Sequence, residues 1–441
     1  MPKRSEAEAG PVMTEAAKYV IVGNSTAAVA AAEAIRERDP DGRLVMISRE
    51  NRHTYSRPLI TYLLGGKIDE ARMEYRRRDF YEKRGIDARL GVEVESVDVE
   101  RRELALSDGS GLGFEQLLLA TGGTPIVPPL EGGNLRGVFT MTGWDDADAV
   151  REFIEENEVE RAVVIGAGMI GIKSIEALRR IGLQVTALEL AGRPLAMALD
   201  VPASELARAE LERNGVDLRC GTTAERILST GDRVGGVALE GGETLICQMV
   251  VFAIGVRPNT AIVAEAAIEV DRGIKVGAGM QTSVPGIYAA GDVAQGVELL
   301  SGKSMPIPIL PGAFRQGRIA GANMAGGDEK YSGGLVMNSI AVFDLPTVSV
   351  GVTAPEGEEY EELVWKRETP PAYKKVVLRN DRVVGAVLVG EVDRAGIFTG
   401  LIKRQVDVSA IKDLILSDEF GVLSLPSEYR KHVVSGQGIE V

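Results

Sequence analysis

Short apolar segments alternate with amphipathic ones along the chain, and one order of segments occurs twice. Residues 18–48 begin with an apolar strand and continue with a glycine-containing turn, an alanine-rich helix and a second apolar strand. Residues 161–189 repeat this order. A crossover helix between two strands makes those strands parallel, so the pattern predicts an α/β protein with two doubly wound domains.

Further patterns indicate where each of these domains closes. Residues 93–106 alternate polar and apolar positions, which is typical of an antiparallel ribbon. Residues 117–122 and 249–255 are apolar strands that end in small residues. The helical segment 312–325 is too rich in alanine and glycine for a solvated outer helix, so we expect the chain to return to the first domain before it.

The last part of the chain changes to strands, at 375–378 and 383–389, followed by a helix at 411–415. This pattern predicts a third domain of the α+β class. The expected division is a disordered leader at 1–17, a first domain of 18–127 with 272–330, a second domain of 128–271 and a third domain of 331–441.

Composition narrows the class of protein. A chain of 441 residues with 45% hydrophobic residues suits roughly three domains of about 150 residues. The net charge of −14 disfavours binding to a phosphate backbone, so no nucleic-acid partner is expected. The sequence has no uninterrupted apolar run of about eighteen residues and begins with a polar segment, which predicts a cytoplasmic protein without a membrane partner.

The second glycine turn, at residues 166–171, has the pattern G-x-G-x-x-G after a strand and before a helix. Its glycines allow a tight turn, a close approach of backbone to pyrophosphate and close helix packing. Glu189, at the next strand end, suits the ribose hydroxyls and favours NADH, while Arg193 keeps NADPH open. The candidate NAD-binding residues are Gly166, Gly168, Met169, Ile170, Gly171 and Glu189.

The first glycine turn is degenerate, because serine and alanine occupy two of its three glycine positions. Alone it does not decide whether a dinucleotide binds. Its acidic partner is also open: Ser48 ends the strand, and Glu50 is the ribose candidate, with a solvated loop acid as the alternative. The candidate residues are Gly23, Ser25, Ala28 and Glu50.

The order of motifs resembles the FAD-dependent pyridine nucleotide-disulfide oxidoreductases over residues 18–441. The resemblance rests on the two glycine turns and on the segments 120–122, 253–258 and 290–292. It implies two Rossmann-like dinucleotide-binding domains for FAD and NAD(H) and a C-terminal interface domain, which often dimerises in this family. The cofactor-binding residues that it adds are Ala120, Thr121, Gly122, Gly255, Gly291 and Asp292, the last for the FAD ribityl chain.

Within this family, residues 53–59 look like the R-P motif of NADH:rubredoxin reductases, ferredoxin reductases, apoptosis-inducing factor and the flavin domain of nitrite reductases. The segments beginning at Asp79 and Trp144 strengthen the rubredoxin reductase likeness, and the chain also resembles the NADH oxidoreductases associated with carbon monoxide dehydrogenase. The resemblance implies that Arg57 and Pro58 flank the flavin ring.

Two departures from the family pattern concern the reaction. Disulfide reductases place a redox cysteine where this chain has residues 55–65, and this segment has none. The only cysteines, Cys220 and Cys247, are too far apart for a C-x-x-C pair and are interpreted as core residues. Lys173 stands where many relatives carry a glutamate that reaches toward the flavin, and it either stabilises a reduced flavin or reaches solvent.

Other polar residues carry weaker hypotheses. Arg72, Arg76, Arg77 and Arg78 form a basic cluster that either steers docking of an acidic carrier or is merely solvated. His53 and His432 show no metal-ligand or hydrolase spacing, so no metal site is expected.

The resemblance implies an enzyme that passes hydride from NADH to FAD and then electrons to a small iron-sulfur carrier of the rubredoxin or ferredoxin kind, or to a partner enzyme. Lys173, Arg57 and Pro58 are its candidate catalytic residues. An NADH oxidase or a nitrite-linked reductase component stays open, as does an NADH-responsive interaction protein. Oligomeric state also stays open, with a homodimer as one outcome.

Overall fold

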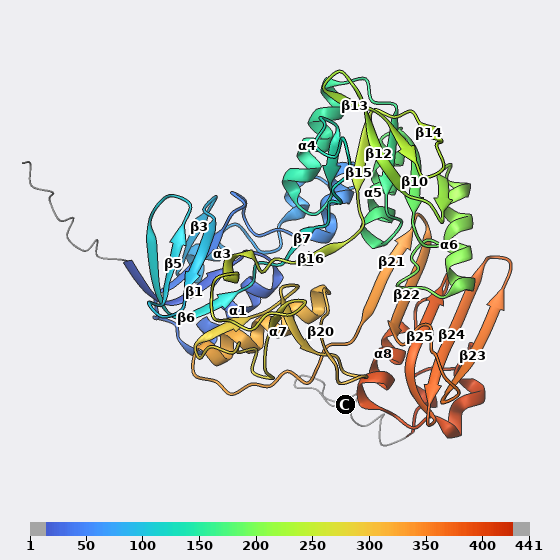
Figure 1. The fold of residues 1–441 in the computed structure, drawn as a ribbon. Helices are drawn as coiled ribbons and strands as arrows, with labels where there is room; N and C mark the ends of the chain where they lie inside the picture. Colours follow the sequence, from blue (N-terminus) through green and yellow to red (C-terminus); the bar gives the residue numbers. More distant parts are fainter. Residues whose placement is uncertain (1–14, 427–441) are drawn as a thin grey trace, which may run out of the picture.

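The computed structural model describes residues 15–426 and divides into three domains (Figure 1). Residues 1–14, which belong to the expected leader, and His432 lie outside this range. The leader was expected to extend to residue 17, but strand β1 already begins at Glu15. This boundary is corrected because Glu15 pairs with Leu112 of the neighbouring strand and Ala17 is buried in the core.

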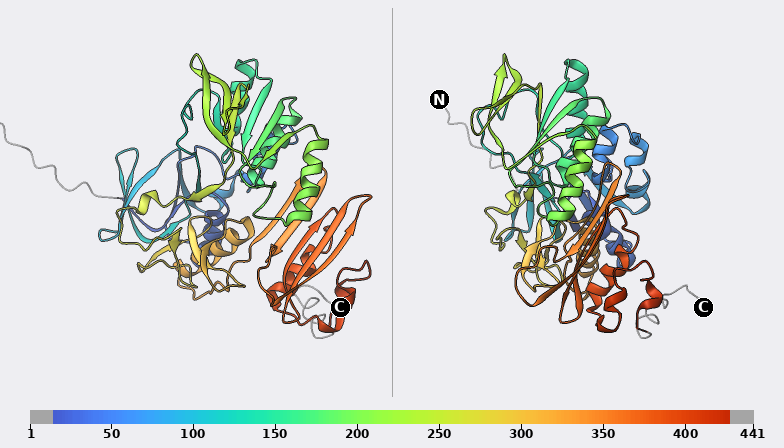
Figure 2. Two further views of the ribbon diagram at one scale, coloured as in Figure 1. Left: turned by 45° about the vertical axis from the view of Figure 1, so that its right-hand side comes forward. Right: turned by 90° about the vertical axis from the view of Figure 1, so that its right-hand side faces the viewer.

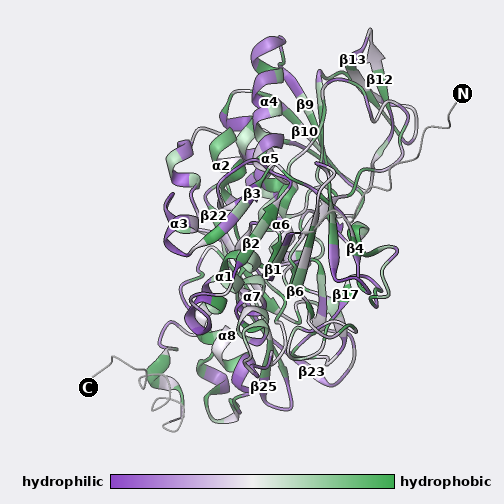
Figure 3. Cartoon of the chain, turned by 90° about the vertical axis from the view of Figure 1, so that its left-hand side faces the viewer, coloured by the Kyte–Doolittle hydropathy of each residue, from purple (hydrophilic) through white to green (hydrophobic). Residues whose placement is uncertain are grey.

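The first domain is built on a twisted sheet with the order β3-β2-β1-β6-β5-β4, and β18 adds to β6. Strands β1, β2, β3, β6 and β18 are parallel, and the ribbon β4–β5 is antiparallel, as expected for residues 93–106. Figure 3 colours the inner strands of this sheet mainly as hydrophobic. The strand bounds are β1 Glu15–Val22, β2 Leu44–Ser48, β3 Ile86–Leu90, β4 Val94–Asp98, β5 Glu103–Leu106, β6 Gly111–Leu119 and β18 Ile287–Ala289.

Helices α1 (Thr26–Arg38) and α7 (Leu310–Met324) pack directly on each other in this domain. A Cβ atom added at Gly317 or Gly321 would approach backbone atoms of α1 closer than 3.0 Å, so the small residues permit this contact. The expected return of the chain to the first domain is therefore present. Further elements here are α3 Phe80–Lys83, β17 Ile274–Lys275, β19 Ala294–Val297 and β20 Ser304–Pro306. Helix α2, Ile60–Leu64, was expected in this domain, but it packs on α4 (Trp144–Glu156) and α5 (Met169–Arg180) of the second domain, because its apolar side chains join the core there.

The return begins earlier than residue 272, which corrects the expected boundary. Strands β7 (Gly123–Pro125) and β16 (Val256–Pro258) pair antiparallel where the chain leaves and re-enters the first domain. Val263 and Ile268 then pack in the core of the first domain, close to β4. Their apolar side chains are buried against this ribbon, a contact that the local sequence pattern does not reveal.

The second domain is a five-stranded parallel sheet with the order β11-β10-β9-β15-β8. A small antiparallel sheet, β12-β13-β14, extends it. The bounds are β8 Val138–Thr140, α4 Trp144–Glu156, β9 Arg161–Ile165, α5 Met169–Arg180, β10 Gln184–Glu189, α6 Val201–Arg213, β11 Asp217–Cys220, β12 Ala224–Thr230, β13 Arg233–Leu239, β14 Thr244–Leu245 and β15 Met249–Phe252.

The third domain is an antiparallel sheet with the order β21-β22-β25-β24-β23 and one α-helix, α8. It lies below the second domain in both views of Figure 2. The expected helix at 411–415 is a 3-10 helix, Ser409–Leu414. The bounds are β21 Met337–Val342, β22 Leu345–Gly351, β23 Tyr360–Arg367, β24 Ala372–Arg379, β25 Arg382–Val389 and α8 Ala395–Arg404.

The second and third domains share one hydrophobic cluster. Ile340 and Val342 of β21 and Tyr373 of β24 pack in the same cluster as Ile172 and Ile175 of α5. The hairpin β21–β22 thus reaches from the third sheet to α5 and α6 (Figure 1). Among the described residues, no helix combines the length and the apolar character that crossing a bilayer requires.

Candidate functional site

The first glycine turn joins β1 to α1. Gly23 has a φ of 129°, and a Cβ atom added there would overlap the carbonyl of Ala120 at the end of β6. Only glycine therefore lets the two strand ends approach at this point. Ser25 is the N-cap of α1 without a side-chain capping bond, and Ala28 is buried in the helix. The degenerate turn keeps the one glycine that its geometry requires.

The carboxyl ends of the first sheet bring Glu50, Arg57 and Asp292 together. Arg57 donates to Glu50 at 2.7 Å and to the carbonyl of Thr142 at 3.0 Å. Burial lowers the pKa of Arg57, but Tyr55, Glu50 and Asp292 oppose it and raise the pKa above its usual value. Burial also raises the pKa of Asp292, and Arg57 partly offsets this rise. Residues distant in sequence thus form one charged cluster.

The backbone beside this cluster is held by side chains. Thr121 donates its hydroxyl to the carbonyl of Asn259 at 2.7 Å, and Asn259 donates its N–H to Gly122 at 2.9 Å. Gly291 donates its N–H to the side chain of Gln316 at 2.8 Å. Gln316 is buried on α7, so the helix that returns from the far part of the chain fixes the turn before Asp292.

These features fit the ribityl-pyrophosphate portion of FAD. Pro58 is the second residue of a 3-10 turn, Arg57–Leu59, and is exposed, so its ring is accessible to a ligand. A half-buried carboxylate such as that of Asp292 is stabilised by hydroxyl donors, which a ribityl chain provides. The N-terminus of α1 supplies free backbone N–H groups for phosphate oxygens.

The second glycine turn is tight, and its backbone is open on one side. Gly166 has a φ of 106°, and a Cβ atom added at Gly171 would overlap the carbonyl of Gly166. A Cβ atom at Gly168, the N-cap of α5, would meet no atom within 4 Å, so this backbone is open to a ligand. Met169 and Ile170 form the first turn of α5 beside it, partly exposed.

Glu189 holds the second glycine turn in place. Its carboxylate accepts the N–H groups of Ala167 and Ala191, each at 2.8 Å. Arg193 turns away and donates to the carbonyls of Ala196 and Leu199. Gly255, with a φ of 111°, follows the neighbouring strand β15. The carboxylate therefore stands at the strand end where ribose binding was expected, and its role toward ribose stays a prediction.

Lys173 has a different environment from the one expected. Its ammonium group donates to both carboxylate oxygens of Glu176, at 2.8 and 2.9 Å, and to the carbonyl of Ala341 in β21. Phe343 donates its N–H to the same carboxylate at 2.7 Å. The lysine charge is therefore neutralised in a contact between α5 and the third domain, and a role toward the flavin stays a prediction.

Three groups in the site were missed by sequence reasoning. The hydroxyl of Tyr55 accepts the N–H of Trp144 at 3.1 Å, and the two rings pack edge to face at 5.5 Å. Arg52 lies over the Trp144 ring at 4.7 Å. Tyr81 donates to Asn24 in the first glycine turn at 2.7 Å. The sequence offered one signal for these groups, their position in or next to the segments 53–59 and 79–82. The contacts themselves join distant parts of the chain and could not be predicted.

Comparison with known proteins follows the same division of the chain. The family model described as "Pyridine nucleotide-disulphide oxidoreductase" matches residues 17–317. The model described as "Rubredoxin NAD+ reductase C-terminal domain" matches residues 337–406.

Curated relatives differ in how much of their length this chain covers. A nitrite reductase [NAD(P)H] of Bacillus subtilis is 30% identical over 89% of this chain, which spans 48% of that relative. Subunit epsilon of the NADH-dependent phenylglyoxylate dehydrogenase of Aromatoleum evansii is 30% identical, over 92% of this chain and 96% of the subunit. A rubredoxin-NAD(+) reductase of Pseudomonas putida is 32% identical, over 70% of this chain and 80% of the relative.

Solved structures have the same fold. A ferredoxin reductase of the CYP199A2 system from Rhodopseudomonas palustris has a TM-score of 0.82 and 26% identity, over 89% of this chain and 95% of that chain. A NAD-dependent persulfide reductase from A. fulgidus has a TM-score of 0.83 and 28% identity, over 91% of this chain and 79% of that chain.

Proposed function

The chain belongs to the pyridine nucleotide-disulphide oxidoreductase family, and from this premise we propose that it passes electrons from NADH to a small iron-sulfur carrier. It is an FAD-dependent NAD(P)H oxidoreductase, as its relatives are. The observation that carries the proposal is the cluster of Glu50, Arg57 and Asp292 beside Pro58. The segment 55–65, which contains Arg57 and Pro58, has no cysteine.

The positions of the cysteines support electron transfer without a thiol. Cys220 ends β11, paired with Glu189, and is only partly buried, which corrects its interpretation as a core residue; the end of an outer strand is not covered on all sides. Cys247 is buried before β15, as expected, so both cysteines belong to the second domain. Burial raises the pKa of Cys220 and raises that of Cys247 to about 12. Neither thiol is therefore appreciably ionised at neutral pH, and the thiolate is the reactive form.

Each group of residues has a separate task in this proposal. The two glycine turns bind the pyrophosphates, and Asp292 and Glu50 with Arg57 orient the flavin end of the site. Bound FAD supplies the conversion between two-electron chemistry at nicotinamide and one-electron chemistry at the acceptor. Arg57 and Pro58 form the protein surface that contacts the flavin ring or the electron acceptor.

Anaerobic stopped-flow reduction tests the proposal. The FAD-loaded protein is mixed with NADH or NADPH, and then with rubredoxin, with ferredoxin or with air. Rapid bleaching by NADH and rapid reduction of a carrier are expected. Slow bleaching with a change in oligomer size would instead favour the interaction protein, and fast reoxidation by air alone would favour an oxidase.

A second candidate is an electron-transfer subunit of a larger enzyme. It is favoured by the match to 96% of the epsilon subunit of phenylglyoxylate dehydrogenase, a relative that is itself a subunit. Affinity purification of the chain from its own cell, followed by sizing under native conditions, separates the candidates. Stoichiometric co-purification of a second enzyme would show that the electron acceptor is a permanently bound partner enzyme and not a free carrier.

Removing both thiols tests the cysteine-independent reaction. The double variant Cys220→Ser, Cys247→Ala should retain NADH-dependent reduction of a one-electron acceptor within about twofold, because no thiol-disulfide exchange takes part. Turnover with ferricyanide measures this, and flavin content shows that the variant has folded. A loss of turnover in the yellow variant would show that a thiol takes part in the reaction.

The basic cluster contains fewer free charges than its sequence suggested. Arg76 pairs with Glu33 at 2.8 Å, and Arg78 pairs with Glu74. Arg77 is 87% exposed and lies 3.9 Å from Asp79. Docking through this cluster therefore depends mainly on the side chains of Arg77 and Arg72. The backbone N–H of Arg72 donates to the side chain of Asp69, the N-cap residue of the turn that contains Arg72.

Charge reversal at Arg77 tests docking. Arg77→Glu should lower the second-order rate of carrier reduction by roughly two- to tenfold at low salt, with a smaller difference at high salt, because electrostatic steering acts on the encounter rate. Arg101→Glu is a matched control, since Arg101 is 78% exposed and lies 3.7 Å from Asp98. Equal rates for the two variants would show that the carrier docks elsewhere.

A further inference from the structure

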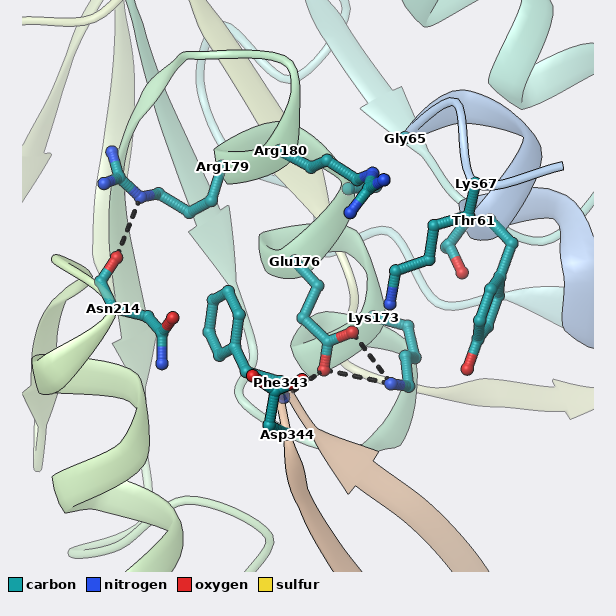
Figure 4. Close-up of a pocket in the computed structure, with 12 residues that line it drawn as sticks. Thr61, Gly65, Lys67, Lys173, Glu176, Arg179, Arg180, Asn214, Phe343 and Asp344 are labelled. Carbon is teal, nitrogen blue, oxygen red and sulfur yellow. Dashed lines mark hydrogen bonds and ion pairs between the residues drawn. The ribbon is translucent and has the colours of Figure 1, made fainter.

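A cavity of about 380 Å³ lies between α2 with its following loop, the C-terminal half of α5 and the turn between β21 and β22 (Figure 4). Its wall includes none of the candidate dinucleotide-binding residues, and of the candidate catalytic residues it includes only Lys173. The volume is within the range of small-molecule sites in proteins. The cavity is therefore large enough for a small molecule, and it is separate from the glycine turns.

The charged side chains around the cavity are not balanced locally. Lys173 is satisfied by Glu176, and Arg179 turns away to donate to the carbonyls of Asn214 and Leu183. Figure 4 shows Arg179 pointing to Asn214. Like Arg179, Lys67 and Arg180 of the wall have no carboxylate within ion-pair distance among the described residues.

Lys67 and Arg180 converge on the same side of α5 in Figure 4, from the loop after α2 and from the end of the helix. Asp344, the only other acidic group of the wall besides Glu176, lies at the opposite end with Phe343. Two like charges that face one space repel each other, and an anion between them removes the repulsion. In a chain with a net charge of −14, this arrangement is a local exception.

Aromatic groups complete the cavity. The ring of Tyr62 lies below the ammonium groups of Lys67 and Lys173, at 5.1 and 5.5 Å. Phe343 forms part of the opposite wall. Guanidinium and ammonium donors suit phosphate oxygens, and the rings offer apolar surface to the organic part of a ligand.

We infer that this cavity binds a small phosphate-bearing metabolite, held by Lys67 and Arg180. The site is separate from the dinucleotide turns, although α5 carries both: Gly168 begins the helix and Arg180 ends it. Lys173 and Glu176 connect the cavity to β21, so an occupant contacts the junction of the second and third domains. Binding there affects the reaction with NADH only if the affinities of the two sites are coupled, and such coupling acts equally in both directions.

Isothermal titration with inorganic pyrophosphate tests the inference. The FAD-loaded protein is first saturated with NAD⁺, so that the glycine turns are filled, and ionic strength is held constant with sodium chloride. One saturable site is expected. Lys67→Gln and Arg180→Gln should each weaken it by about tenfold, the value of one charge-assisted hydrogen bond. Arg101→Gln, at a residue outside the cavity wall, should leave it unchanged.

Three results would overturn the inference: no saturable binding, equal binding in the wild type and both variants, or binding that disappears when NAD⁺ is present. The last would assign the pyrophosphate to the dinucleotide site. Both substituted side chains are exposed, and thermal melting shows that each variant is folded. The test needs no electron acceptor, so its outcome is independent of the proposed carrier.

Discussion

Replacing Gly171 by alanine is expected to abolish reduction by NADH while the protein stays yellow. The added methyl group would overlap the carbonyl of Gly166, so the second glycine turn must open. Overpacking of this kind costs about 1–3 kcal/mol in stability, and an opened turn no longer presents its N–H groups to pyrophosphate. The first domain has its own core, so FAD binding should survive.

Anaerobic stopped-flow measures this effect, with dithionite as the reductant that needs no nucleotide site. The variant should bleach with dithionite and fail to bleach with NADH. Gly168→Ala is the matched comparison, because its methyl group meets no protein atom within 4 Å. That variant should melt like the wild type and yet bind NADH roughly tenfold or more weakly. Normal bleaching of Gly171→Ala by NADH would contradict the assignment of the turn.

Asp292→Ala should release FAD. Asp292 lies at the carboxyl end of the first sheet, where burial raises the pKa of its carboxyl group and the charge of Arg57 partly offsets this rise. Loss of a hydrogen bond that involves a charged group costs about 1.5–3 kcal/mol, which corresponds to roughly 10- to 150-fold weaker FAD binding. The variant should purify pale and recover its colour only at high FAD concentration.

Fluorescence titration of the cofactor-free protein with FAD gives the two dissociation constants directly. Asp328→Ala is a control in the same domain, because the Asp328 side chain is 85% exposed and, within residues 15–426, its only ion pair is with the nearby Lys330. Equal FAD affinity in Asp292→Ala and the wild type would remove Asp292 from the site.

The local sequence predicted most elements that carry the cofactor turns. Strands β2 and β10 end at the expected residues, Ser48 and Glu189, and the helices α1 and α5 begin directly after the expected turns. These features depend on side-chain periodicity and on glycine sterics, which act between residues close in sequence. The site residues at these turns could be named for the same reason.

The environments of two basic side chains differ from those that the sequence suggested. Arg76 and Lys173 were expected to present positive charge, but each is paired with a carboxylate. Glu33 lies 43 positions from Arg76, and the third domain closes around Lys173 from 168 positions away. Sequence spacing carries no information on the Arg76–Glu33 pair or on the contact of Lys173 with Ala341, because both depend on tertiary packing. The pair of Lys173 with Glu176 is different, since i,i+3 positions on one helix are neighbours and their spacing could have indicated it.

The sequence by itself therefore determined the two glycine turns, the parallel strands around them and the absence of a cysteine beside Arg57. Only the tertiary structure decided that Glu50, Arg57 and Asp292 meet, and that Lys67 and Arg180 face one cavity without an acidic partner among the described residues. The physical reason is range: backbone sterics and periodicity act along a few residues, whereas electrostatic contacts and cavities form only when distant segments pack together.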